Sequence, residues 1–593
     1  MSERVPEAIE RGLKFRWKTA PCAAGGPLVE RVLARRAIAQ PEAFLNPSLS
    51  QLSDPSVIPG VDRAAERLLS AARAREPIVI YGDYDVDGIT ATAIVYRMLR
   101  AIEPEARITT YVPHRIDEGY GLSAEAIAAL AAEGARVIVS VDCGITAVEP
   151  ARIAREAGVD LIITDHHNPP ADGAPLPGAF AIVHPALAGE ASTLRDLCGA
   201  GVAYKLAWRL ATMASGAARV HDDLRTLLID LLGLVALGTI ADVVPLVGEN
   251  RVLTHFGLGR IRSTPFIGLR ALVAASGLAK ESIDTERVGF SLAPRINACG
   301  RMGHAREAIE LLLTDDLSRA EAIACELASL NDQRRATERA IVDEASQLAE
   351  AAGMTGADRR AIVLAHEAWH PGVVGIVCSR LVERFSRPVL LMQRQAERST
   401  GSGRSIDGFN LHAALAACAG HLESFGGHDM AAGLRVRHEC YDAFVEAFLD
   451  HAGEQLAPSD LVRTLEYDVD ATLGEFSLRA VEDLSRLAPF GRGNPPVRLR
   501  VRGGRLNAAP RTMGARGAHL TFDLAGGEER GGSEGPGGSG GRVGGVRVVG
   551  WNWGDVASQL GPGATIDAIL TPKLSTWGGR TKVEAELADL RVI

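Results

Sequence analysis

Residues 78–88 have the sequence Ile-Val-Ile-Tyr-Gly-Asp-Tyr-Asp-Val-Asp-Gly. The apolar run at 78–81 is typical of a strand that is buried on both faces. Three carboxylates, Asp83, Asp85 and Asp87, follow at alternate positions where the strand ends and a helix begins. Their mutual repulsion calls for a nearby positive charge, and oxygen ligands suit Mg²⁺ and Mn²⁺. The stretch therefore predicts a strand-to-helix turn that carries a divalent metal site.

The same arrangement recurs twice further along the chain. An apolar run at 137–141 ends at Asp142, and another at 161–164 ends at Asp165-His166-His167. A single aspartate usually caps a helix or forms a turn, and a single histidine is usually structural. Three such motifs at three strand ends are difficult to assign to caps, and open α/β sheets bind ligands at that edge.

A further carboxylate, Asp242, follows the apolar helical segment that ends in Gly238-Thr239-Ile240-Ala241. A site for two metal ions needs several carboxylates, one of which bridges the ions, together with neutral imidazoles. The residues that offer these groups are Asp83, Asp85, Asp87, Asp142, His166, His167 and Asp242.

Length and composition restrict the class of protein. The 593 residues predict three or four domains, and 47% hydrophobic and 23% charged residues are typical of a soluble globular protein. A net charge of −9 excludes a basic surface over the whole molecule, so any anion-binding face must be local. Eight scattered cysteines without a Cys-x-x-Cys pair indicate a reducing, cytoplasmic environment. The most apolar segment, 227–247, is interrupted by two aspartates and a proline, which favours a buried helix over a membrane span.

Alternating strand and helix patterns predict a parallel, doubly wound sheet in the first third of the chain. Helices are expected at 123–133 and 147–157, between strands at 77–81, 107–112, 137–141, 160–164 and 180–183. Residues 200–275 are helical in pattern, and 315–351 predicts one long or two joined connecting helices.

A second α/β unit is predicted from residue 361, with strands at 361–365 and 388–392 and a helix from Pro371. Glycine-rich turns are expected at 401–403 and 426–427. Beyond residue 462, short alternating runs predict a small β-barrel, and the glycine-dominated stretch 526–545 predicts a flexible loop.

Several of these motifs resemble a known family. Asp85-x-Asp87, Asp142, Asp165-His166-His167 and the segment 238–242 resemble the four motifs of the DHH phosphoesterase superfamily. Longer segments at 44–49, 81–88, 115–121, 294–301, 401–405, 426–433 and 489–495 resemble its RecJ-type members. The resemblance implies a parallel-sheet α/β DHH domain and a smaller α/β DHHA1 domain joined by a long helix, followed by an OB-type β-barrel. The expected limits are 1–50 for an N-terminal extension, 51–310 for the DHH domain, 311–353 for the connecting helix, 354–460 for the DHHA1 domain and 461–593 for the barrel.

The resemblance also implies an activity, namely 5′→3′ exonuclease hydrolysis of single-stranded DNA in recombination and repair, with two Mn²⁺ or Mg²⁺ ions. One ion would be held by Asp85 and Asp142 with help from Asp83, and the other by Asp87, Asp142, His166 and Asp242. Asp142 would bridge the ions, and His167 would lie near the scissile phosphate. Asp165 would orient the imidazoles by hydrogen bonding. A channel between the two α/β domains is expected to admit one strand and to reject a duplex.

The same resemblance marks the substrate-binding positions as Arg115, Tyr120, His167, Arg295, Arg301, Ser402, Arg404 and His428. Judged alone, each of these arginines is as well explained by a surface ion pair. In the barrel, Trp551, Trp553, Trp577, Arg580 and Lys582 offer stacking and charge for single-stranded DNA, although core packing competes as an explanation for each tryptophan. Two positions depart from the pattern: Tyr81 stands where many relatives have histidine, and His184 where asparagine is expected.

Two other functions fit part of the pattern. One is a phosphoesterase for oligoribonucleotides, cyclic dinucleotides or pyrophosphate, which would need only the two α/β domains. The other is a non-catalytic replication factor similar to Cdc45, which could have lost metal ligands that this chain retains. The resemblance further implies contacts with a single-strand-binding protein and a RecQ-type helicase. An enclosed channel favours a monomer, and no membrane association is expected.

Overall fold

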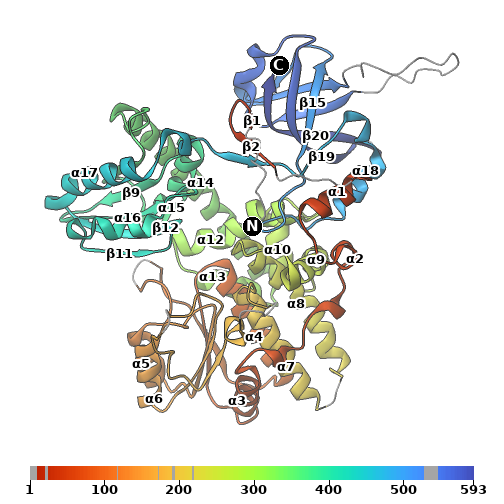
Figure 1. The fold of residues 1–593 in the computed structure, drawn as a ribbon. Helices are drawn as coiled ribbons and strands as arrows, with labels where there is room; N and C mark the ends of the chain where they lie inside the picture. Colours follow the sequence, from red (N-terminus) through yellow and green to blue (C-terminus); the bar gives the residue numbers. More distant parts are fainter. Residues whose placement is uncertain are drawn as a thin grey trace, which may run out of the picture.

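The structure is a computed structural model that describes residues 10–19, 25–115, 118–170, 173–189, 194–216, 219–526, 545–577 and 579–593. Figure 1 shows three lobes: an α/β lobe at the bottom, a second α/β lobe at the left and a β-barrel at the top. Of the predicted flexible loop, residues 527–544 lie outside the described part of the chain.

The first lobe contains the predicted parallel sheet, with the strand order β4-β3-β5-β6-β7. Every residue of β3 and β5 is buried, as the apolar runs predict for strands covered on both faces. The strands are β3 (Ile78–Gly82), β4 (Ile108–Tyr111), β5 (Val137–Val141), β6 (Asp160–Thr164) and β7 (Ala181–Val183). The covering helices include α3 (Val61–Arg73), α4 (Val86–Ile102), α5 (Ala124–Ala132) and α6 (Val148–Glu156).

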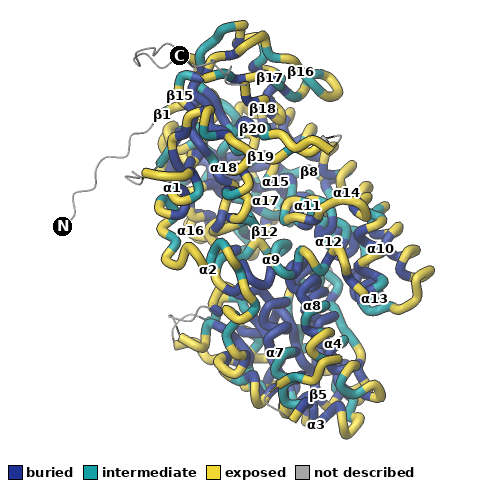
Figure 2. The backbone as a smooth tube through the Cα atoms, turned by 90° about the vertical axis from the view of Figure 1, so that its right-hand side faces the viewer, coloured by how far each residue is buried: buried dark blue, intermediate teal, exposed yellow. Residues whose placement is uncertain are grey.

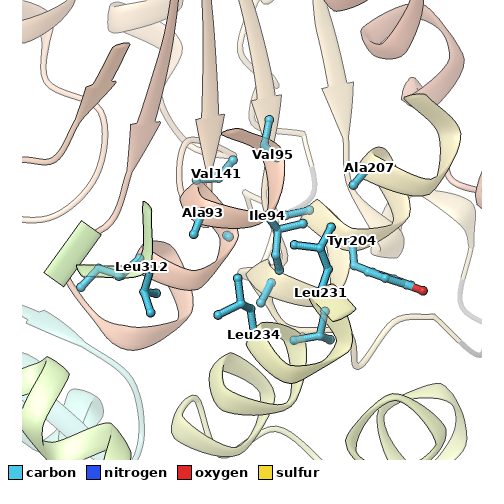
Figure 3. Close-up of a cluster of buried hydrophobic side chains, with 14 of the residues drawn as sticks. Ala93, Ile94, Val95, Val141, Tyr204, Ala207, Leu231, Leu234 and Leu312 are labelled. Atoms are coloured by element: carbon cyan, nitrogen blue, oxygen red, sulfur yellow. The ribbon is translucent and has the colours of Figure 1, made fainter. Parts of the chain in front are cut away.

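The core of this lobe lies where α4 meets two long helices, α7 (Gly199–Ser215) and α8 (Asp222–Ala241). Figure 3 shows Ile94 of α4, Tyr204 of α7 and Leu231 of α8 packed together. In the described ranges, α8 is the one helix whose length and hydropathy would allow it to cross a membrane. It is instead a core helix, because it packs against α4, α7 and α9 (Gly248–Arg262). Figure 2 shows this buried region in dark blue around α7, α8 and β5.

A helical connection leads to the second lobe. A π-helical turn, η4 (Val288–Leu292), follows the short α11 (Thr285–Arg287) and runs directly into α12 (Ala293–Met302). Helix α14 (Leu317–Ala351) packs against α10 (Ile267–Ala275) and α13 (Arg306–Leu313) and continues as one helix of 35 residues. The predicted long connecting helix is therefore present as a single element.

The second lobe has a mixed sheet with the order β11-β12-β10-β9-β8. Its strands are β8 (Ile362–His366), β9 (Val389–Arg394), β10 (Arg398–Arg404), β11 (Ser424–Gly427) and β12 (Ala431–Arg437). Its helices are α15 (Pro371–Phe385), α16 (Leu411–Ala417) and α17 (His438–Gln455).

The predicted glycine-rich turns in this lobe are wrong, because both segments lie within strands. Gly401 and Gly403 belong to β10, and Gly426 and Gly427 belong to β11. The glycines of β10 allow close packing: a Cβ on Gly401 would lie 2.0 Å from the carbonyl oxygen of Leu391. Glycine is needed at this position because the neighbouring strand leaves no room for a side chain, and not because the chain reverses there.

The third lobe is a barrel whose strands follow the order β14-β15-β19-β20-β18-β17-β16, with β15 also pairing with β17 to close it. The strands are β14 (Val469–Asp470), β15 (Leu499–Leu506), β16 (Arg511–Met513), β17 (His519–Ala525), β18 (Val546–Gly550), β19 (Thr565–Trp577) and β20 (Arg580–Val592). Helix α18 (Leu478–Ser485) packs against β19. The predicted β-barrel is confirmed.

The described N-terminal residues pack on this barrel, although they lie more than 440 residues away in sequence. Strand β2 (Arg16–Lys18) pairs with β1 (Glu10–Arg11) and, in parallel, with β13 (Thr464–Glu466). The buried Trp17 donates from Nε1 to Asp589 Oδ2 over 2.7 Å. Helix α1 (Leu28–Arg35) then packs against α18.

Candidate metal centre

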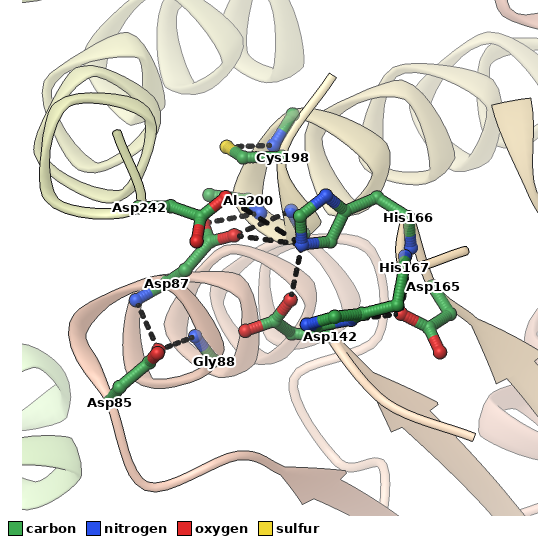
Figure 4. Close-up of polar contacts among 12 residues, drawn as sticks. Asp85, Asp87, Gly88, Asp142, Asp165, His166, His167, Cys198, Ala200 and Asp242 are labelled. Carbon is green, nitrogen blue, oxygen red and sulfur yellow. Dashed lines mark hydrogen bonds and ion pairs between the residues drawn. The ribbon is translucent and has the colours of Figure 1, made fainter. Parts of the chain in front are cut away.

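The carboxyl ends of β3, β5 and β6 meet the first turns of α4 and α7 and the end of α8 at one place (Figure 4). Asp85 caps α4, because its Oδ1 accepts hydrogen bonds from the backbone N–H groups of Asp87 (2.9 Å) and Gly88 (3.2 Å). Asp142 follows β5 directly and has a φ of +64°, in the left-handed region where aspartate and asparagine are enriched. The strand ends thus bring the predicted carboxylates together.

Potential ligand atoms form three overlapping groups, each with mutual distances within 4.8 Å. The groups are Asp83, Asp85 and Asp142; Asp87, His166 and Asp242; and Asp142, His166 and His167. Asp142 belongs to the first and the third group. His166 Nε2 lies 3.1 Å from Asp142 Oδ1, 3.7 Å from Asp242 Oδ2 and 3.8 Å from Asp87 Oδ2. The group with Asp83 and Asp85 and the group with Asp87 and Asp242 therefore meet at Asp142 and His166, which is the arrangement that a pair of ions requires.

The electrostatics of these groups fit divalent cations. Burial and the neighbouring carboxylates raise the pKa of Asp83 and Asp142 well above the usual range, and that of Asp242 to about 8. Burial lowers the pKa of His166, which keeps its imidazole neutral. In the described part of the chain, Asp83 Oδ1 is buried without a hydrogen-bond partner. Asp142 Oδ1 and His166 Nε2 are also buried, and apart from their 3.1 Å approach to each other they make no hydrogen bond. Buried oxygens that repel one another, with a neutral imidazole between them, are a donor set that suits Mn²⁺ or Mg²⁺.

Asp87 is held in place by the N-terminus of α7. Its two carboxylate oxygens accept hydrogen bonds from the backbone N–H groups of Gly199 (2.6 Å) and Ala200 (2.8 Å). Two glycines make this close approach possible. A Cβ on Gly199 would lie 2.4 Å from Asp142 Oδ1, and one on Gly238 would lie 2.6 Å from Asp87 Oδ1. These backbone donors were not anticipated, because a main-chain N–H group has no signature in the sequence.

The two adjacent histidines have different surroundings. Asp165 Oδ1 accepts from His167 Nδ1 (2.8 Å) and from the backbone N–H of His166 (2.7 Å), and Oδ2 accepts from Ile145 N (2.9 Å). Burial opposes charge on both side chains, yet their hydrogen bond lowers the pKa of Asp165 to about 2 and raises that of His167 to about 9. The side chain of Asp165 thus orients the imidazole of His167, while the imidazole of His166 faces the carboxylates. The Tyr120 hydroxyl lies 3.1 Å from His167 Nδ1.

The two positions that depart from the family pattern have structural roles. Tyr81 is fully buried and its hydroxyl donates to the carbonyl oxygen of Gly121 (3.0 Å), so it supports the segment that carries Tyr120. His184 Nδ1 accepts from Ala186 N (3.1 Å), which leaves Nε2 to donate to the carbonyl oxygen of His167 (2.8 Å). His184 therefore fixes the backbone of the histidine pair.

Replacing His184 by asparagine is expected to keep the activity of this site within a few-fold of wild type, because an amide offers the same acceptor and donor. Leucine has similar bulk but leaves the His167 carbonyl and the Ala186 N–H unpaired. Each unpaired buried group costs about 1–3 kcal/mol. His184→Leu should therefore lower both the melting temperature and kcat. Equal behaviour of the two variants in thermal unfolding would contradict this role.

Four of the predicted substrate-binding residues lie on the side of the site where Asp83 and Asp85 are found. They are Arg115, Arg301, Ser402 and Arg404. The guanidinium of Arg115 lies 4.9 Å from the ring centroid of Tyr84. Burial, together with the charges of Arg115, Arg334 and Arg404, lowers the pKa of Arg301 to about 10. A Cβ on Gly375 would lie 3.3 Å from Arg404 Nη2 and 3.5 Å from Ser402 Oγ, so this cluster also borders α15. Crowded arginines of this kind favour a bound anion.

Other predicted residues lie apart from that cluster. Arg295 Nη1 donates to the carbonyl oxygen of Ser291 (2.5 Å). Burial lowers the pKa of Arg295, whose charged neighbours are Asp332 and Arg335 of α14. His428 is exposed between β11 and β12. In the barrel, Trp553 is buried in the core and Trp551 is 53% exposed. Arg580 and Lys582 are exposed, and the Trp577 side chain lies outside the described part of the chain.

A cavity of about 1090 Å³ lies between the first lobe and the barrel. Its lining includes Thr239, Val243, Phe290 and Asn297 on the first-lobe side and Phe490 and Lys573 on the barrel side. Phe290, on the π-helical turn η4, is 74% exposed. The lining includes the residues on either side of Asp242, so one end of the cavity lies beside the candidate metal centre. The cavity therefore extends from the barrel to the end of α8.

Comparison with known proteins identifies all three lobes. The family models that match are the DHH family N-terminal domain over residues 77–239, the DHHA1 domain over 358–454 and the RecJ OB domain over 467–589. The single-stranded-DNA-specific exonuclease RecJ of Bacillus subtilis is 35% identical over 571 residues, which cover 95% of this chain and 68% of that protein. The protein of the same name from Dickeya dadantii is 38% identical over 478 residues, which cover 79% of this chain and 82% of that protein.

Solved structures give the same result. The crystal structure of RecJ in complex with Mn²⁺ from Thermus thermophilus matches with a TM-score of 0.77 and 32% identity, covering 95% of this chain and 75% of that one. The corresponding complex with Mg²⁺ matches with a TM-score of 0.72 and 30% identity, covering 95% and 74%. The two metals in these relatives are those that the donor set described above suits.

Proposed function

The chain belongs to the RecJ family of single-stranded-DNA-specific exonucleases and is a metal-dependent exonuclease of that type; we propose that it degrades the strand from its 5′ end with two divalent ions at Asp142. The observation that carries the proposal is the position of Asp142 between two ligand groups: it belongs to the group with Asp83 and Asp85, and its Oδ1 lies 3.1 Å from His166 Nε2 in the group with Asp87 and Asp242. A non-catalytic role is disfavoured, because every motif carboxylate and both histidines lie at this edge.

The candidate metal ligands form two sets, one for each ion. Asp83, Asp85 and Asp142 form one group and would hold one ion. Asp87, His166 and Asp242 form another group and would hold the second ion, with Asp142 joining them because its Oδ1 lies 3.1 Å from His166 Nε2. When bound, such ions supply an acidified water nucleophile and stabilise the charge that develops on the phosphate. The chain's own contribution is to fix these ligands: α7 holds Asp87 through two N–H groups, and the turn at Asp142 directs its carboxylate inward. This division of the ligands follows the family resemblance as well as the geometry.

Two further groups act on the substrate. With its pKa raised to about 9 by Asp165, the imidazole of His167 is protonated at neutral pH and, beside the Tyr120 hydroxyl, stabilises negative charge on the scissile phosphate. The arginine cluster of Arg115, Arg301 and Arg404 binds a phosphate of the strand on the other side of the carboxylates. His428 and Arg295 would bind the strand further from the centre.

The strand reaches this centre through the cavity beside the barrel. The family resemblance leads to the expectation of a channel between the two α/β lobes, whereas the cavity described above lies between the first lobe and the barrel. Enclosure by the barrel would keep a strand bound between successive cleavages, and the width of the cavity would reject a duplex. This need for the barrel disfavours a dinucleotide phosphoesterase, for which the two α/β lobes suffice.

We infer a cytoplasmic monomer that meets its substrate with a single-strand-binding protein and a RecQ-type helicase. These partners follow from the family resemblance. Size-exclusion chromatography with light scattering tests the monomer, and pull-down with the two purified partners tests the contacts.

A long single-stranded oligonucleotide with one end blocked tests the activity and its direction together. With Mn²⁺ or Mg²⁺, the wild-type chain should degrade the strand with a free 5′ end and leave the strand with a blocked 5′ end intact. Blunt duplex of the same sequence should resist degradation. Equal activity on the duplex, or degradation that starts at the 3′ end, would contradict the proposal.

A further inference from the structure

The segment between α18 and β15, residues 486–496, is fixed against the first lobe; it is called the junction segment below. Arg251, on α9, is 2% exposed, and the hydrogen-bond partners of its guanidinium are carbonyl oxygens. It donates to the carbonyl oxygens of Arg486 (3.1 Å), Leu487 (2.8 Å) and Ala488 (2.8 Å). Asn494 Nδ2 donates to the carbonyl oxygens of Leu487 and Pro489, both over 2.8 Å. The path of the junction segment is therefore determined by buried hydrogen bonds.

The junction segment touches the turn that follows Asp242. The backbone N–H of Leu246 donates to the carbonyl oxygen of Arg492 over 2.7 Å. A Cβ on Gly491 would lie 2.7 Å from Leu246 Cδ1, and Gly493 has a φ of +74° with Pro245 beside it. Glycine on both sides of Arg492 allows this approach. Arg492 is thereby placed across the lobe boundary, against the turn that leads away from Asp242.

The side chain of Arg492 differs from its neighbours in having no partner. It is exposed and lines the cavity together with Thr239, Ile240 and Ala241, the residues that lead to Asp242. Throughout the described ranges, its guanidinium has no hydrogen bond or ion pair, whereas that of Arg486 donates to Asn46 Oδ1 (3.2 Å). Burial and two aspartates raise the pKa of Asp242, and the charge of Arg492 acts against them, so Arg492 lies within electrostatic reach of the site.

We propose that Arg492 binds the DNA strand: its guanidinium contacts a phosphate oxygen near the scissile bond, on the Asp242 side of the carboxylates. The inference deepens the proposed function and rests on it. The charge of Arg115 acts on Asp83 and that of Arg301 on Asp85, whereas the charge of Arg492 acts on Asp242. Cationic groups thus stand at both ends of the carboxylate set. The junction segment completes the active site, and the barrel contributes more than a separate DNA-binding surface.

The test compares Arg492→Gln and Arg492→Lys with Arg486→Gln, a control that removes a paired arginine from the same segment and cavity. Degradation of a single-stranded oligonucleotide is measured with Mn²⁺, and binding is measured in EDTA by fluorescence anisotropy over a range of salt concentrations. A lost charge-assisted contact lowers kcat/KM by about 10- to 100-fold in Arg492→Gln. Loss of one phosphate contact reduces the slope of log Kobs against log salt by about 0.7. Lysine should restore most of the activity and the slope.

Three results would overturn the inference. They are an Arg492→Gln variant as active as wild type, one whose losses equal those of Arg486→Gln, and one with an unchanged salt slope but weakened Mn²⁺ binding in calorimetry. The last result would mean that Arg492 acts on Asp242 instead of on DNA. Failure of the wild-type chain to degrade single-stranded DNA would show separately that the proposed function is at fault.

Discussion

Asp142→Asn is expected to reduce the rate of DNA hydrolysis by a factor on the order of 10³ or more, because it removes the carboxylate that lies between the two ligand groups. Asparagine preserves the shape of the side chain and tolerates the φ of +64° at this position. The fold should therefore remain intact. Without metal, the variant should even be more stable than wild type, since one of several buried, mutually repelling carboxylates is gone.

Single-turnover hydrolysis of a labelled oligonucleotide and thermal unfolding in EDTA measure these two effects. Asp160→Asn is the matched control, because Asp160 lies at the opposite end of β6 and forms an ion pair with Arg67. The control should keep wild-type turnover. Binding of DNA should persist in Asp142→Asn, since its arginines are unchanged. Turnover near the wild-type rate in Asp142→Asn would show that the bridging assignment is wrong.

Gly238→Ala is expected to lower activity by about 100-fold, because the added methyl group would displace the side chain of Asp87. In an open helix this substitution stabilises by about 1 kcal/mol. Here the new Cβ would lie 2.6 Å from Asp87 Oδ1 and from Thr90 Oγ1, and 2.7 Å from the Cβ of Ala200. Asp87 must move away from the α7 N-terminus, and a displacement of about 1 Å of a catalytic group is enough for a loss of that size.

Gly259→Ala provides the comparison, because Gly259 is also within a helix, α9, and has no atom within 4 Å of its expected Cβ. That variant should be as active as wild type and equal or greater in stability. Mn²⁺ affinity, measured by calorimetry, should fall in Gly238→Ala only. Equal activity of the two variants would mean that Asp87 does not need its present position.

The sequence was sufficient to predict the sheet and the convergence at its edge. The buried strands β3 and β5 are almost entirely apolar, and parallel strands that end in acidic residues must bring those residues to the same edge. This rule alone predicts the position of Asp142. It does not predict the different surroundings of His166 and His167, because the directions of two adjacent side chains at a strand end depend on contacts in the folded structure that the sequence pattern does not show.

Long-range and main-chain interactions explain what was missed. The donors that hold Asp87 are backbone N–H groups of Gly199 and Ala200, which almost any residue type could supply. The pairing of Arg16 with Thr464 joins two short polar strands without an alternating pattern. The glycines in β10 suggest a turn in the sequence because glycine serves both chain reversal and close packing, and only the contacts with the neighbouring strand show which of the two applies.

Anomalous scattering from crystals grown with Mn²⁺ tests the central claim most directly, namely that this edge of the sheet holds a pair of divalent ions. The account predicts two peaks that flank the carboxylate of Asp142, one beside Asp83 and Asp85 and the other beside Asp87, His166 and Asp242. A single peak, or none within coordination distance of Asp142, would contradict it.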